Sequence, residues 1–367
     1  MGNHFQKGLM WNSVWFESQT ITQLQQPPFL PTGKAEETLN QQVLDFLHQW
    51  YDGNQHIELQ TSGSTGKPKI IRVEKHQMVQ SALMTGKYFG LQSGNTALLC
   101  LSPEFIAGKM MIVRAIVLGL NLIIQPLDAL ITAQTPVTFD FAAMVPLQVA
   151  RLLRENPAIF QHIRTLIIGG SSLSAPIETA LQSVSTQCWH TYAMTETVSH
   201  VAVRPINGPN KTSWFTPLEG ISIFLNPAGC LCIDAPFIAA ETIETNDLAE
   251  MDQGKFKILG RTDDVVISAG YKINLAQTEQ KLGTVISQPF FLTSENHDES
   301  GQILVLFVED KPSANSLHEL SQKIDSVLHS AEKPRKIIQM PHFEYLGSGK
   351  ISKHGTRLKH ASDTFRL

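Results

Sequence analysis

Nine consecutive residues combine hydroxyl, glycine and lysine groups in a way that suits the binding of a phosphate. They are Thr61, Ser62, Gly63, Ser64, Thr65, Gly66, Lys67, Pro68 and Lys69. Glycine lets the backbone turn its N–H groups toward an anion, while hydroxyl and ammonium groups donate further hydrogen bonds. The spacing is not that of a Walker A loop, and the proline after Lys67 favours extended chain over a helix. An ordinary mobile surface loop has the same composition, so both interpretations stay open for this stretch alone.

Acidic and aromatic residues further along the chain likewise suit either a role in ligand binding or an ordinary structural role. The hydroxyl of Thr195 and the carboxylate of Glu196 suit Mg²⁺ and a phosphate oxygen, although a solvated loop acid is the simpler interpretation. Tyr192 offers an aromatic face for stacking on a base, and it is equally suited to core packing. Asp247 can accept hydrogen bonds from two neighbouring hydroxyls with its two oxygens. Each residue alone is therefore weak evidence for a site.

Five segments, in order along the chain, resemble the motifs of the adenylate-forming superfamily of acyl- and aryl-CoA ligases, luciferases and peptide-synthetase adenylation domains. They are residues 61–69, 192–197, 245–247, 260–264 and 349–351. Ala193 and Asn246 stand where glycine is usual in these motifs. The resemblance implies an AMP-forming acid–CoA ligase with ATP and CoA as co-substrates and Mg²⁺ as cofactor. A carboxylic acid would be activated as its adenylate and then transferred to the CoA thiol.

The resemblance also implies a role for each matching position. The ATP-binding residues would be Thr61, Ser62, Gly63, Ser64, Thr65, Gly66, Lys67, Gly169, Gly170, Tyr192, Asp247 and Arg261. Lys350 would stabilise negative charge as the carboxylate attacks the α-phosphate. Thr195 and Glu196 would complete the catalytic set, with Glu196 as the Mg²⁺ ligand. Asp263 would be the hinge about which a small C-terminal domain rotates between the two half-reactions.

A second set of segments resembles the o-succinylbenzoate–CoA ligases of menaquinone synthesis. It comprises residues 102–108, an arginine six residues after Gly108, and residues 144–148. That acid has two carboxylates, and the one that is not activated needs a fixed cation in an otherwise apolar pocket. Arg114 and Lys109 are the candidates, and the planar fork of arginine can pair a carboxylate bidentately. The alternative is an arginine that reaches the surface from an apolar helix.

Several functions stay open beside the ligation of 2-succinylbenzoate to CoA. Another aryl- or acyl-CoA ligase, or an enzyme that passes its adenylate to a carrier protein, would carry the same superfamily motifs. A nucleotide-binding regulator without turnover is an alternative of a different class. Two histidines near the motifs, His190 and His200, receive no role from the sequence, and either suits a core or surface position.

Strand-like and helix-like segments alternate ahead of residue 221, after an amphipathic helix over residues 39–51. The predicted strands are 57–60, 70–73, 96–100, 139–145 and 165–168, and the predicted helices are 76–89, 109–118, 146–154 and 176–183. Such alternation predicts an α/β sheet with a substantial parallel part and ligands at the strand ends.

The chain changes character twice after this region. Residues 221–233 predict a hairpin, and with it a small antiparallel or barrel-like β part. After residue 263 the pattern predicts strands 265–268, 303–308 and 336–340 and helices 275–282 and 316–329. We therefore expect an α/β protein with an N-terminal ATP- and acid-binding domain over 1–262 and a mobile α+β domain over 263–367 that carries the catalytic lysine.

Composition limits the class of protein. The 367 residues are 42% hydrophobic and 17% charged with a formal net charge of −4, which indicates neither a nucleic-acid nor an acidic-membrane partner. Four cysteines are too few for a disulfide scaffold, and the apolar stretch 110–124 is interrupted by Arg114. We expect a cytoplasmic protein without a membrane span, with an N-terminal region shorter than is usual in the superfamily. Whether it forms a homo-oligomer stays open.

Overall fold

A computed structural model describes residues 8–61, 69–132, 137–268, 270–297, 301–311, 314–346 and 351–364. The chain divides into two compact units. The first contains Met1–Ser172, Ala180–Ser222 and Ile233–Ile243, and the second contains Leu173–Thr179, Ile223–Cys232 and Glu244–Leu367. The predicted domain boundary between residues 262 and 263 refers to the C-terminal segment that is expected to rotate during the reaction, and it stays a prediction.

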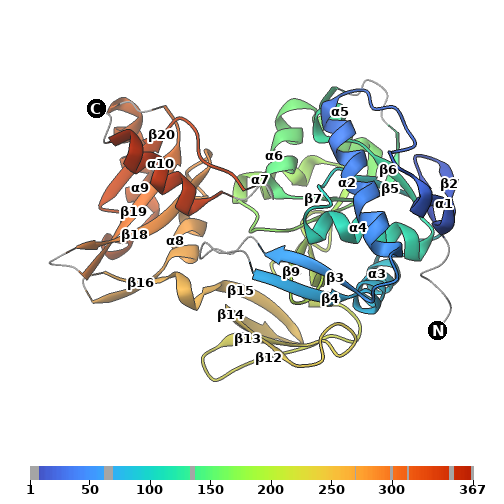
Figure 1. Ribbon diagram of the computed structural model, residues 1–367. Coiled ribbons are helices and arrows are strands. Elements are labelled where there is room, and N and C mark those ends of the chain that lie inside the picture. The colour runs from blue at the N-terminus through green and yellow to red at the C-terminus, as the bar shows by residue number, and fades with distance from the viewer. Residues whose placement is uncertain are drawn as a thin grey trace. The chain divides into compact units, whose positions relative to one another are not determined.

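The first unit is built on a nine-stranded sheet in the order β11-β10-β9-β8-β7-β5-β6-β1-β2 (Figure 1). Its strands are β1 (Leu9–Trp11), β2 (Val14–Phe16), β5 (Thr96–Leu99), β6 (Asn121–Ile124), β7 (Phe139–Met144), β8 (Ile163–Ile168), β9 (Gln187–Ala193), β10 (His200–Pro205) and β11 (Thr216–Pro217). The strands from β9 to β1 pair in parallel, whereas β2, β10 and β11 add antiparallel edges. The predicted α/β sheet with a large parallel part is confirmed.

The strand order reverses direction beside β5, because β6 lies on one side of it and β7 on the other. Ligands in such sheets bind at the carboxyl ends of the strands next to a reversal. The segments that follow β5 and β7 are joined there, since the Gln148 side chain donates to the carbonyl of Cys100 (2.9 Å) and accepts from the N–H of Val145 (3.1 Å). Val145 and Gln148 belong to residues 144–148, one of the segments that resemble the o-succinylbenzoate ligases, and Cys100 lies two residues ahead of the other, residues 102–108.

Helices cover the sheet of the first unit. They are α1 (Ser18–Gln23), α2 (Lys34–Tyr51), α3 (Lys75–Phe89), α4 (Ile106–Leu118), α5 (Leu127–Thr132) and α6 (Pro146–Glu155). Figure 1 shows α2, α3 and α4 beside one another. Residues 108–116 of α4 are all buried, as expected of a helix that is apolar on every side. Among the described residues, no helix is long and apolar enough to cross a membrane.

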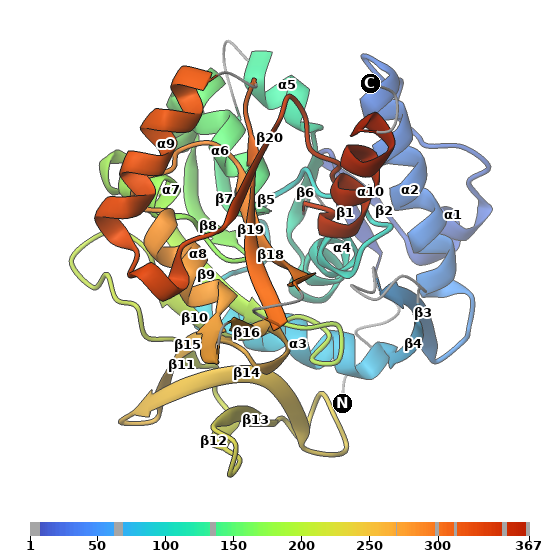
Figure 2. The same ribbon diagram turned by 90° about the vertical axis from the view of Figure 1, so that its left-hand side faces the viewer.

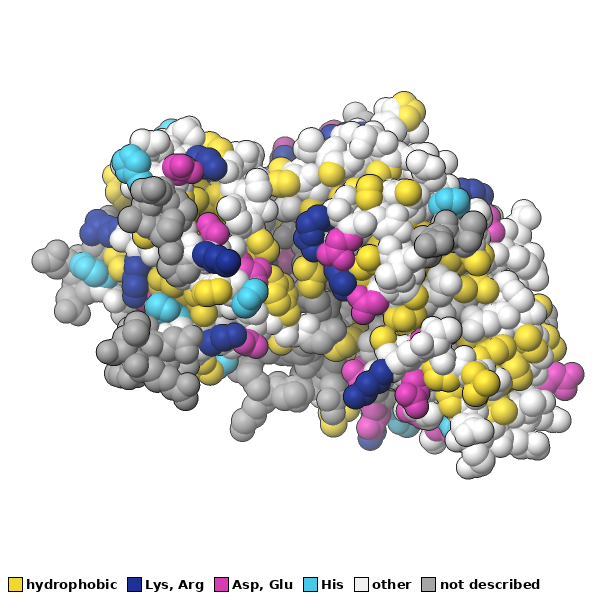
Figure 3. Space-filling view, turned by 90° about the horizontal axis from the view of Figure 1, so that it is seen from above, with side chains coloured by type: hydrophobic (Ala, Val, Ile, Leu, Met, Phe, Trp, Pro, Cys, Tyr) yellow, Lys and Arg dark blue, Asp and Glu magenta, His cyan; other side chains and the backbone are white. Residues whose placement is uncertain are grey.

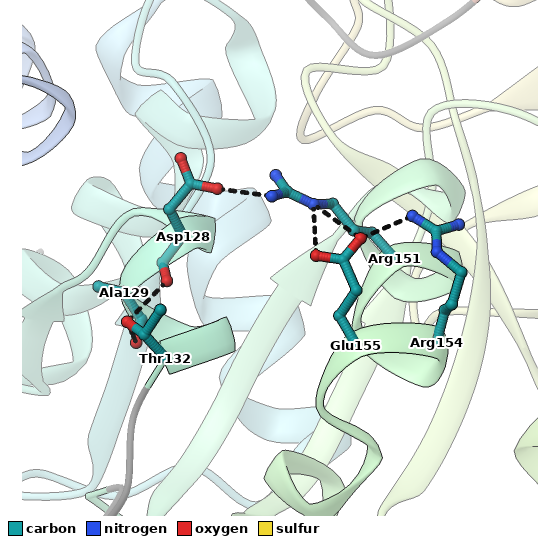
Figure 4. A network of polar contacts seen from close by, with 6 residues as sticks. All are labelled: Asp128, Ala129, Thr132, Arg151, Arg154 and Glu155. Carbon is teal, nitrogen blue, oxygen red and sulfur yellow. Dashed lines mark hydrogen bonds and ion pairs between the residues drawn. The ribbon is translucent and has the colours of Figure 1, made fainter.

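A surface network links α5 to α6 (Figure 4). Arg151 contacts Asp128 at 2.8 Å and Glu155 at 3.1 Å, and Arg154 contacts Glu155 at 2.7 Å. Exposed pairs of this kind contribute at most about 1 kcal/mol each. Basic and acidic side chains also lie beside one another elsewhere on the face drawn in Figure 3. Arg151 therefore has a structural use in joining two helices.

Strands β3 (His56–Thr61) and β4 (Lys69–Glu74) pair antiparallel with each other, in a two-stranded sheet separate from the large one. The register runs from His56 opposite Glu74 to Thr61 opposite Lys69. The extended chain predicted after the proline is confirmed. The hydroxyl- and glycine-rich residues 62–68 join these two strands in sequence and lie outside the described residues.

The second unit contains two sheets. One has the order β12-β13-β14-β15, with β12 (Ser222–Leu225), β13 (Cys230–Asp234), β14 (Ile243–Asp252) and β15 (Lys255–Arg261). In the other, β17 (Tyr271–Asn274), β16 (Val265–Ser268), β19 (Gly301–Glu309) and β18 (Phe290–His297) are neighbours, and β20 (Lys336–Met340) pairs with β19. The helices are α7 (Ala175–Ala180), α8 (Leu275–Leu282), α9 (Ala314–Val327) and α10 (Lys353–Thr364). The predicted α+β character is confirmed.

Side chains of β19 alternate between two cores. Leu304 and Leu306 pack with residues of α8 and α9, whereas Val305 and Phe307 face the opposite side. Phe307 there meets the ring of His360 in α10, with ring centroids 5.8 Å apart. Figure 2 shows α9 and α10 on the two sides of these strands. The strand period of two thus creates two buried faces in this unit.

Candidate active site

The candidate residues of the first unit follow the carboxyl ends of neighbouring parallel strands. Gly169 and Gly170 follow β8, whereas Tyr192 lies near the end of β9 and Glu196 in the turn after it. Because β8 and β9 run parallel, these segments lie at one edge of the sheet. The structure therefore brings together residues that are far apart in the sequence.

Gly169 packs directly against the next strand. Its N–H donates to the carbonyl of Met144 at 3.1 Å, and a Cβ at this position would overlap the hydroxyl of Thr191. That hydroxyl donates to the carbonyl of Ile168 at 3.2 Å, so it is held in place. Only glycine fits here, which explains one of the two glycines that the sequence suggested as a nucleotide-binding turn.

His190, in β9, contacts the loop that follows β8. Its Nε2 lies 3.2 Å from the carbonyl oxygen of Ser171, and its ring lies 5.3 Å from that of Phe215. Phe215 also contacts the edge of Tyr192, at 6.1 Å between centroids. Burial, with a smaller contribution from Arg204, lowers the pKa of His190 to about 3. His190 is therefore a neutral packing group beside the aromatic residue proposed to stack on adenine.

The turn after β9 has an unusual backbone. Val198 has φ = 65°, a left-handed conformation that is strained for a β-branched residue. The hydroxyl of Thr197 accepts from the N–H of Met194 at 3.0 Å and lies 2.8 Å from the carbonyl oxygen of Ser199. Glu196 is exposed in this turn. The surrounding hydrogen bonds fix a conformation that the chain alone would not favour.

Arg114 is the most unusual buried group of the first unit. It is only 2% exposed and has no acidic partner among the described residues. Its Nη2 donates to the hydroxyl of Ser199 at 2.7 Å and its Nε to the hydroxyl of Thr85 at 3.3 Å. Burial lowers the pKa of Arg114 to about 9. A buried guanidinium with neutral partners is costly, which points to an anionic ligand.

His200 completes this neutral network. The hydroxyl of Thr85 donates to the carbonyl of Ser81 at 3.0 Å, so its oxygen accepts from the Nε2–H of His200 at 3.3 Å. The Nδ1 atom then has a lone pair, which faces Nη2 of Arg114 at 3.5 Å. Burial and the charge of Arg114 hold the pKa of His200 well below its usual value. Sequence spacing gave no signal for Thr85, which is far from both partners in the chain.

Lys109, the other cation predicted to bind the acid, lies on a different side of α4. It is 8% exposed, and its Nζ lies 5.0 Å from the ring centroid of Phe46 in α2. Arg114 instead contacts Thr85 in α3. Burial lowers the pKa of Lys109, and Glu104 partly offsets this. The structure does not bring the two predicted cations together, so a role for Lys109 stays a prediction.

The candidate nucleotide residues of the second unit form an ion-pair cluster. Arg261 lies opposite Asp247 in the pairing of β14 with β15, at 3.3 Å between Nη1 and Oδ1. It also contacts both carboxylate oxygens of Asp263 at 2.8 Å. The Arg261 guanidinium thereby lowers the pKa of Asp263. Arg261 thus joins the predicted ribose ligand to the predicted hinge residue.

The described residues fit a Mg²⁺ ion that arrives with a nucleotide. Among them, no group of three or more metal-ligating side chains is present. The carboxylate of Glu196 is exposed and has no hydrogen bond or ion pair within the described part of the chain. Mg²⁺ is commonly held by one or two carboxylates together with phosphate oxygens and water. Glu196 suits such a site.

Several predicted residues lie outside the described ranges. They are Ser62, Gly63, Ser64, Thr65, Gly66, Lys67 and Lys350, together with the side chain of Thr61. The residues that flank the segment of Lys350 are anchored, because Tyr345 and Ile351 form an antiparallel bridge. The hydroxyl of Tyr345 donates to Glu309 in β19 at 2.6 Å.

Comparison with known proteins places these features in a family. The family model described as AMP-binding enzyme matches residues 22–224. A solved structure of an acyl-CoA synthetase (AMP-forming)/AMP-acid ligase II-like protein from Dyadobacter fermentans is 32% identical, with a TM-score of 0.60. The match covers 93% of this chain and 98% of that one. The fold predicted from the motifs is thereby confirmed.

Curated relatives are more distant and longer. Tyrocidine synthase 3 of Brevibacillus parabrevis is 26% identical over 341 residues, which cover 80% of this chain and 5% of that protein. The 2-succinylbenzoate–CoA ligase of Salmonella typhimurium is 25% identical over 312 residues, which cover 80% of this chain and 66% of the ligase. The chain thus spans less than two thirds of the length of these relatives. The family model nevertheless matches more than half of the chain, which therefore belongs to the AMP-binding enzyme family.

Proposed function

We propose that this protein is an ATP-dependent, AMP-forming acid–CoA ligase whose acid is 2-succinylbenzoate. An oxygen of the succinyl carboxylate attacks the α-phosphorus of ATP, and pyrophosphate leaves with the electron pair of the broken P–O bond. The CoA thiol then releases its proton to the solvent, and its sulfur attacks the acyl carbon. AMP leaves, and 2-succinylbenzoyl-CoA is the product. No covalent bond to the protein forms in either step.

The buried guanidinium of Arg114 is the observation that carries the choice of acid. A cation at 2% exposure with neutral partners lacks the compensating charge that buried ions in proteins normally have. An acid with a second, non-reacting carboxylate supplies that charge when it binds. A fatty acid would leave the guanidinium uncompensated in an apolar site, so its binding would be weaker.

The remaining roles follow the motifs. Residues 61–67 bind the β- and γ-phosphates, and Tyr192 and Asp247 hold the adenosine. Glu196 would hold a Mg²⁺ ion that arrives with the nucleotide, and such an ion would supply charge neutralisation at the phosphates. Lys350 places its ammonium charge against the transition state at the α-phosphate, with Thr195 as a hydrogen-bond donor. Arg261 joins Asp247 to Asp263, which serves as the hinge of the mobile domain.

The relatives support two neighbouring activities. The name of the Salmonella protein states the ligation of 2-succinylbenzoate to CoA, whereas the name of tyrocidine synthase 3 states the synthesis of tyrocidine. The buried arginine favours the first. Transfer of the adenylate to a carrier protein, which the superfamily motifs leave open, stays an outcome that the test must be able to detect.

The test is the formation of AMP from ATP by the purified chain with 2-succinylbenzoate, in the presence and absence of CoA. The proposal predicts AMP and the CoA thioester in equal amounts, and neither when the acid is omitted. AMP release that depends on another aryl or acyl acid would reassign the substrate. Pyrophosphate exchange without thioester formation would indicate a carrier-protein enzyme, and no AMP with any acid would indicate a binding protein without turnover.

A further inference from the structure

Ser199 connects the buried guanidinium of Arg114 to the half-buried part of the site by a hydrogen bond. Nη2 of Arg114 donates to its hydroxyl oxygen at 2.7 Å, a short hydrogen bond from a charged donor. Arg114 itself is 2% exposed, whereas Ser199 is half-buried. A ligand that approaches this part of the site therefore meets the serine hydroxyl before the guanidinium.

The hydrogen of the Ser199 hydroxyl is available for a ligand. Its oxygen is already an acceptor for Arg114, so the hydroxyl hydrogen must point elsewhere. Within the described part of the chain, this hydroxyl meets the Nδ1 lone pair of His200 at 3.4 Å, a length at which a hydroxyl makes a weak hydrogen bond. Rotation about the Cβ–Oγ bond can therefore direct this hydrogen to a ligand at little cost.

The charge of Arg114 makes this hydroxyl a strong donor. A hydroxyl that accepts from a guanidinium is polarised, and in a site of low dielectric the effect on its own O–H bond is larger than in water. The other neighbours, Thr85 and His200, are neutral and do not cancel the charge. The pair thus suits a carboxylate better than a neutral group.

The strained turn fixes where Ser199 lies. Val198 is 1% exposed and has φ = 65°, although a β-branched residue disfavours that conformation. The N–H of Val198 donates to the carbonyl of Thr195 at 3.0 Å, and the hydroxyl of Thr197 lies 2.8 Å from the Ser199 carbonyl. Strain that persists because neighbouring bonds enforce it is typical of functional positions.

We propose that Ser199 is a specificity-determining residue that donates a hydrogen bond to the non-reacting carboxylate of the acid. Arg114 then acts through Ser199 on that carboxylate, and Thr85 and His200 are positioning residues for Arg114. The inference rests on the proposed function, since it needs an acid with two carboxylates. It adds a contacting side chain that the sequence motifs did not indicate.

The experiment compares Ser199→Ala with the wild-type enzyme on two acids. One is 2-succinylbenzoate, and the other is 4-oxo-4-phenylbutanoate, which has the same reacting carboxylate and no carboxylate on the ring. Loss of a hydrogen bond to a charged group raises KM for 2-succinylbenzoate about tenfold or more. The KM values for 4-oxo-4-phenylbutanoate and ATP change less than about twofold, since neither contact involves this hydroxyl.

Two further variants separate this role from a structural one. Ser199→Thr keeps the hydroxyl and restores most of the affinity for 2-succinylbenzoate. Ser185→Ala removes another serine hydroxyl of the same unit, bound to the carbonyl of Phe160 at 3.4 Å, and leaves all KM values unchanged. The comparison of two acids stays valid if Ser199→Thr does not fold.

The outcomes distinguish the two proposals. Equal changes in KM for both acids, or no change in Ser199→Ala, would overturn the role of Ser199 while the ligase activity stands. A wild-type enzyme that forms no thioester from 2-succinylbenzoate would overturn the proposed function, and the role of Ser199 with it. A selective loss for the dicarboxylate supports both.

Discussion

Replacing Arg114 with methionine should weaken acid binding without destabilising the fold. Burial lowers the pKa of Arg114 to about 9, so the site disfavours its charge by roughly 5 kcal/mol relative to water. Methionine has a similar length and no charge, so this cost disappears in the variant. The hydrogen bonds to Thr85 and Ser199 are lost, which costs about 1 kcal/mol each. The free energy of unfolding should therefore stay the same or rise.

The effect on binding should be large and selective. Removing one partner of a buried charge pair costs about 3 kcal/mol or more, which corresponds to roughly a hundredfold increase in KM. We expect this increase for 2-succinylbenzoate and little change in KM for ATP. Steady-state kinetics in which each substrate is varied separately measure the two values, and urea unfolding of the same samples measures stability.

A matched control is Arg151→Met. Arg151 is a partly exposed arginine of the same unit that pairs with Asp128 and Glu155 (Figure 4), so its loss should change neither KM. Arg114→Lys keeps a charge and should recover part of the acid affinity. If Arg114→Met instead unfolds at much lower urea concentrations and raises both KM values equally, Arg114 is a structural group and does not select the acid.

Three further predictions concern other parts of the site. Gly169→Ala should lower the free energy of unfolding by about 1–3 kcal/mol and raise KM for ATP. Adding Thr191→Ala should recover most of the lost stability, because it removes the hydroxyl that the new Cβ overlaps. A double variant that is no more stable than Gly169→Ala would refute this. His190 and His200 stay neutral in the fold with lowered pKa values, so stability is full above about pH 6.5 and falls below it. Urea unfolding should show a loss of about 2 kcal/mol from His190 between pH 7 and pH 5 and a further loss from His200, and an unchanged pH dependence in the His200→Gln variant would contradict this. Lys350→Ala should abolish acid-dependent pyrophosphate exchange and leave thioester formation from supplied acyl adenylate largely intact; loss of both would contradict the assigned role.

Most elements of the fold were predictable because their patterns are long and periodic. The helix expected over residues 39–51 begins earlier, at Lys34, and the strand expected over 165–168 begins at Ile163. The sequence did not indicate that β3 and β4 leave the large sheet, because strand patterns carry no information on pairing partners. Short strands such as β1 and β11 have too few residues to show a period of two.

The sequence could suggest candidate site residues where a motif is local, and it gave no signal for contacts between residues that are distant in the chain. The adjacency of Tyr192 and Glu196 can be recognised in one segment. The contact of Thr85 with Arg114 and His200 arises only because α3, α4 and the start of β10 pack together. The structure also shows that Lys109 and Arg114, both candidate cations for the acid, have different neighbours, which are Phe46 in α2 for Lys109 and Thr85 and Ser199 for Arg114.

The most direct test of the central claim uses 2-succinylbenzoate labelled with ¹⁸O in the succinyl carboxylate only. Attack of that carboxylate on the α-phosphorus, followed by cleavage of the acyl adenylate by CoA, transfers one labelled oxygen to AMP. Mass spectrometry of the AMP should show one ¹⁸O atom for each thioester formed. Unlabelled AMP, or turnover that yields ADP and phosphate, would contradict adenylation of this acid.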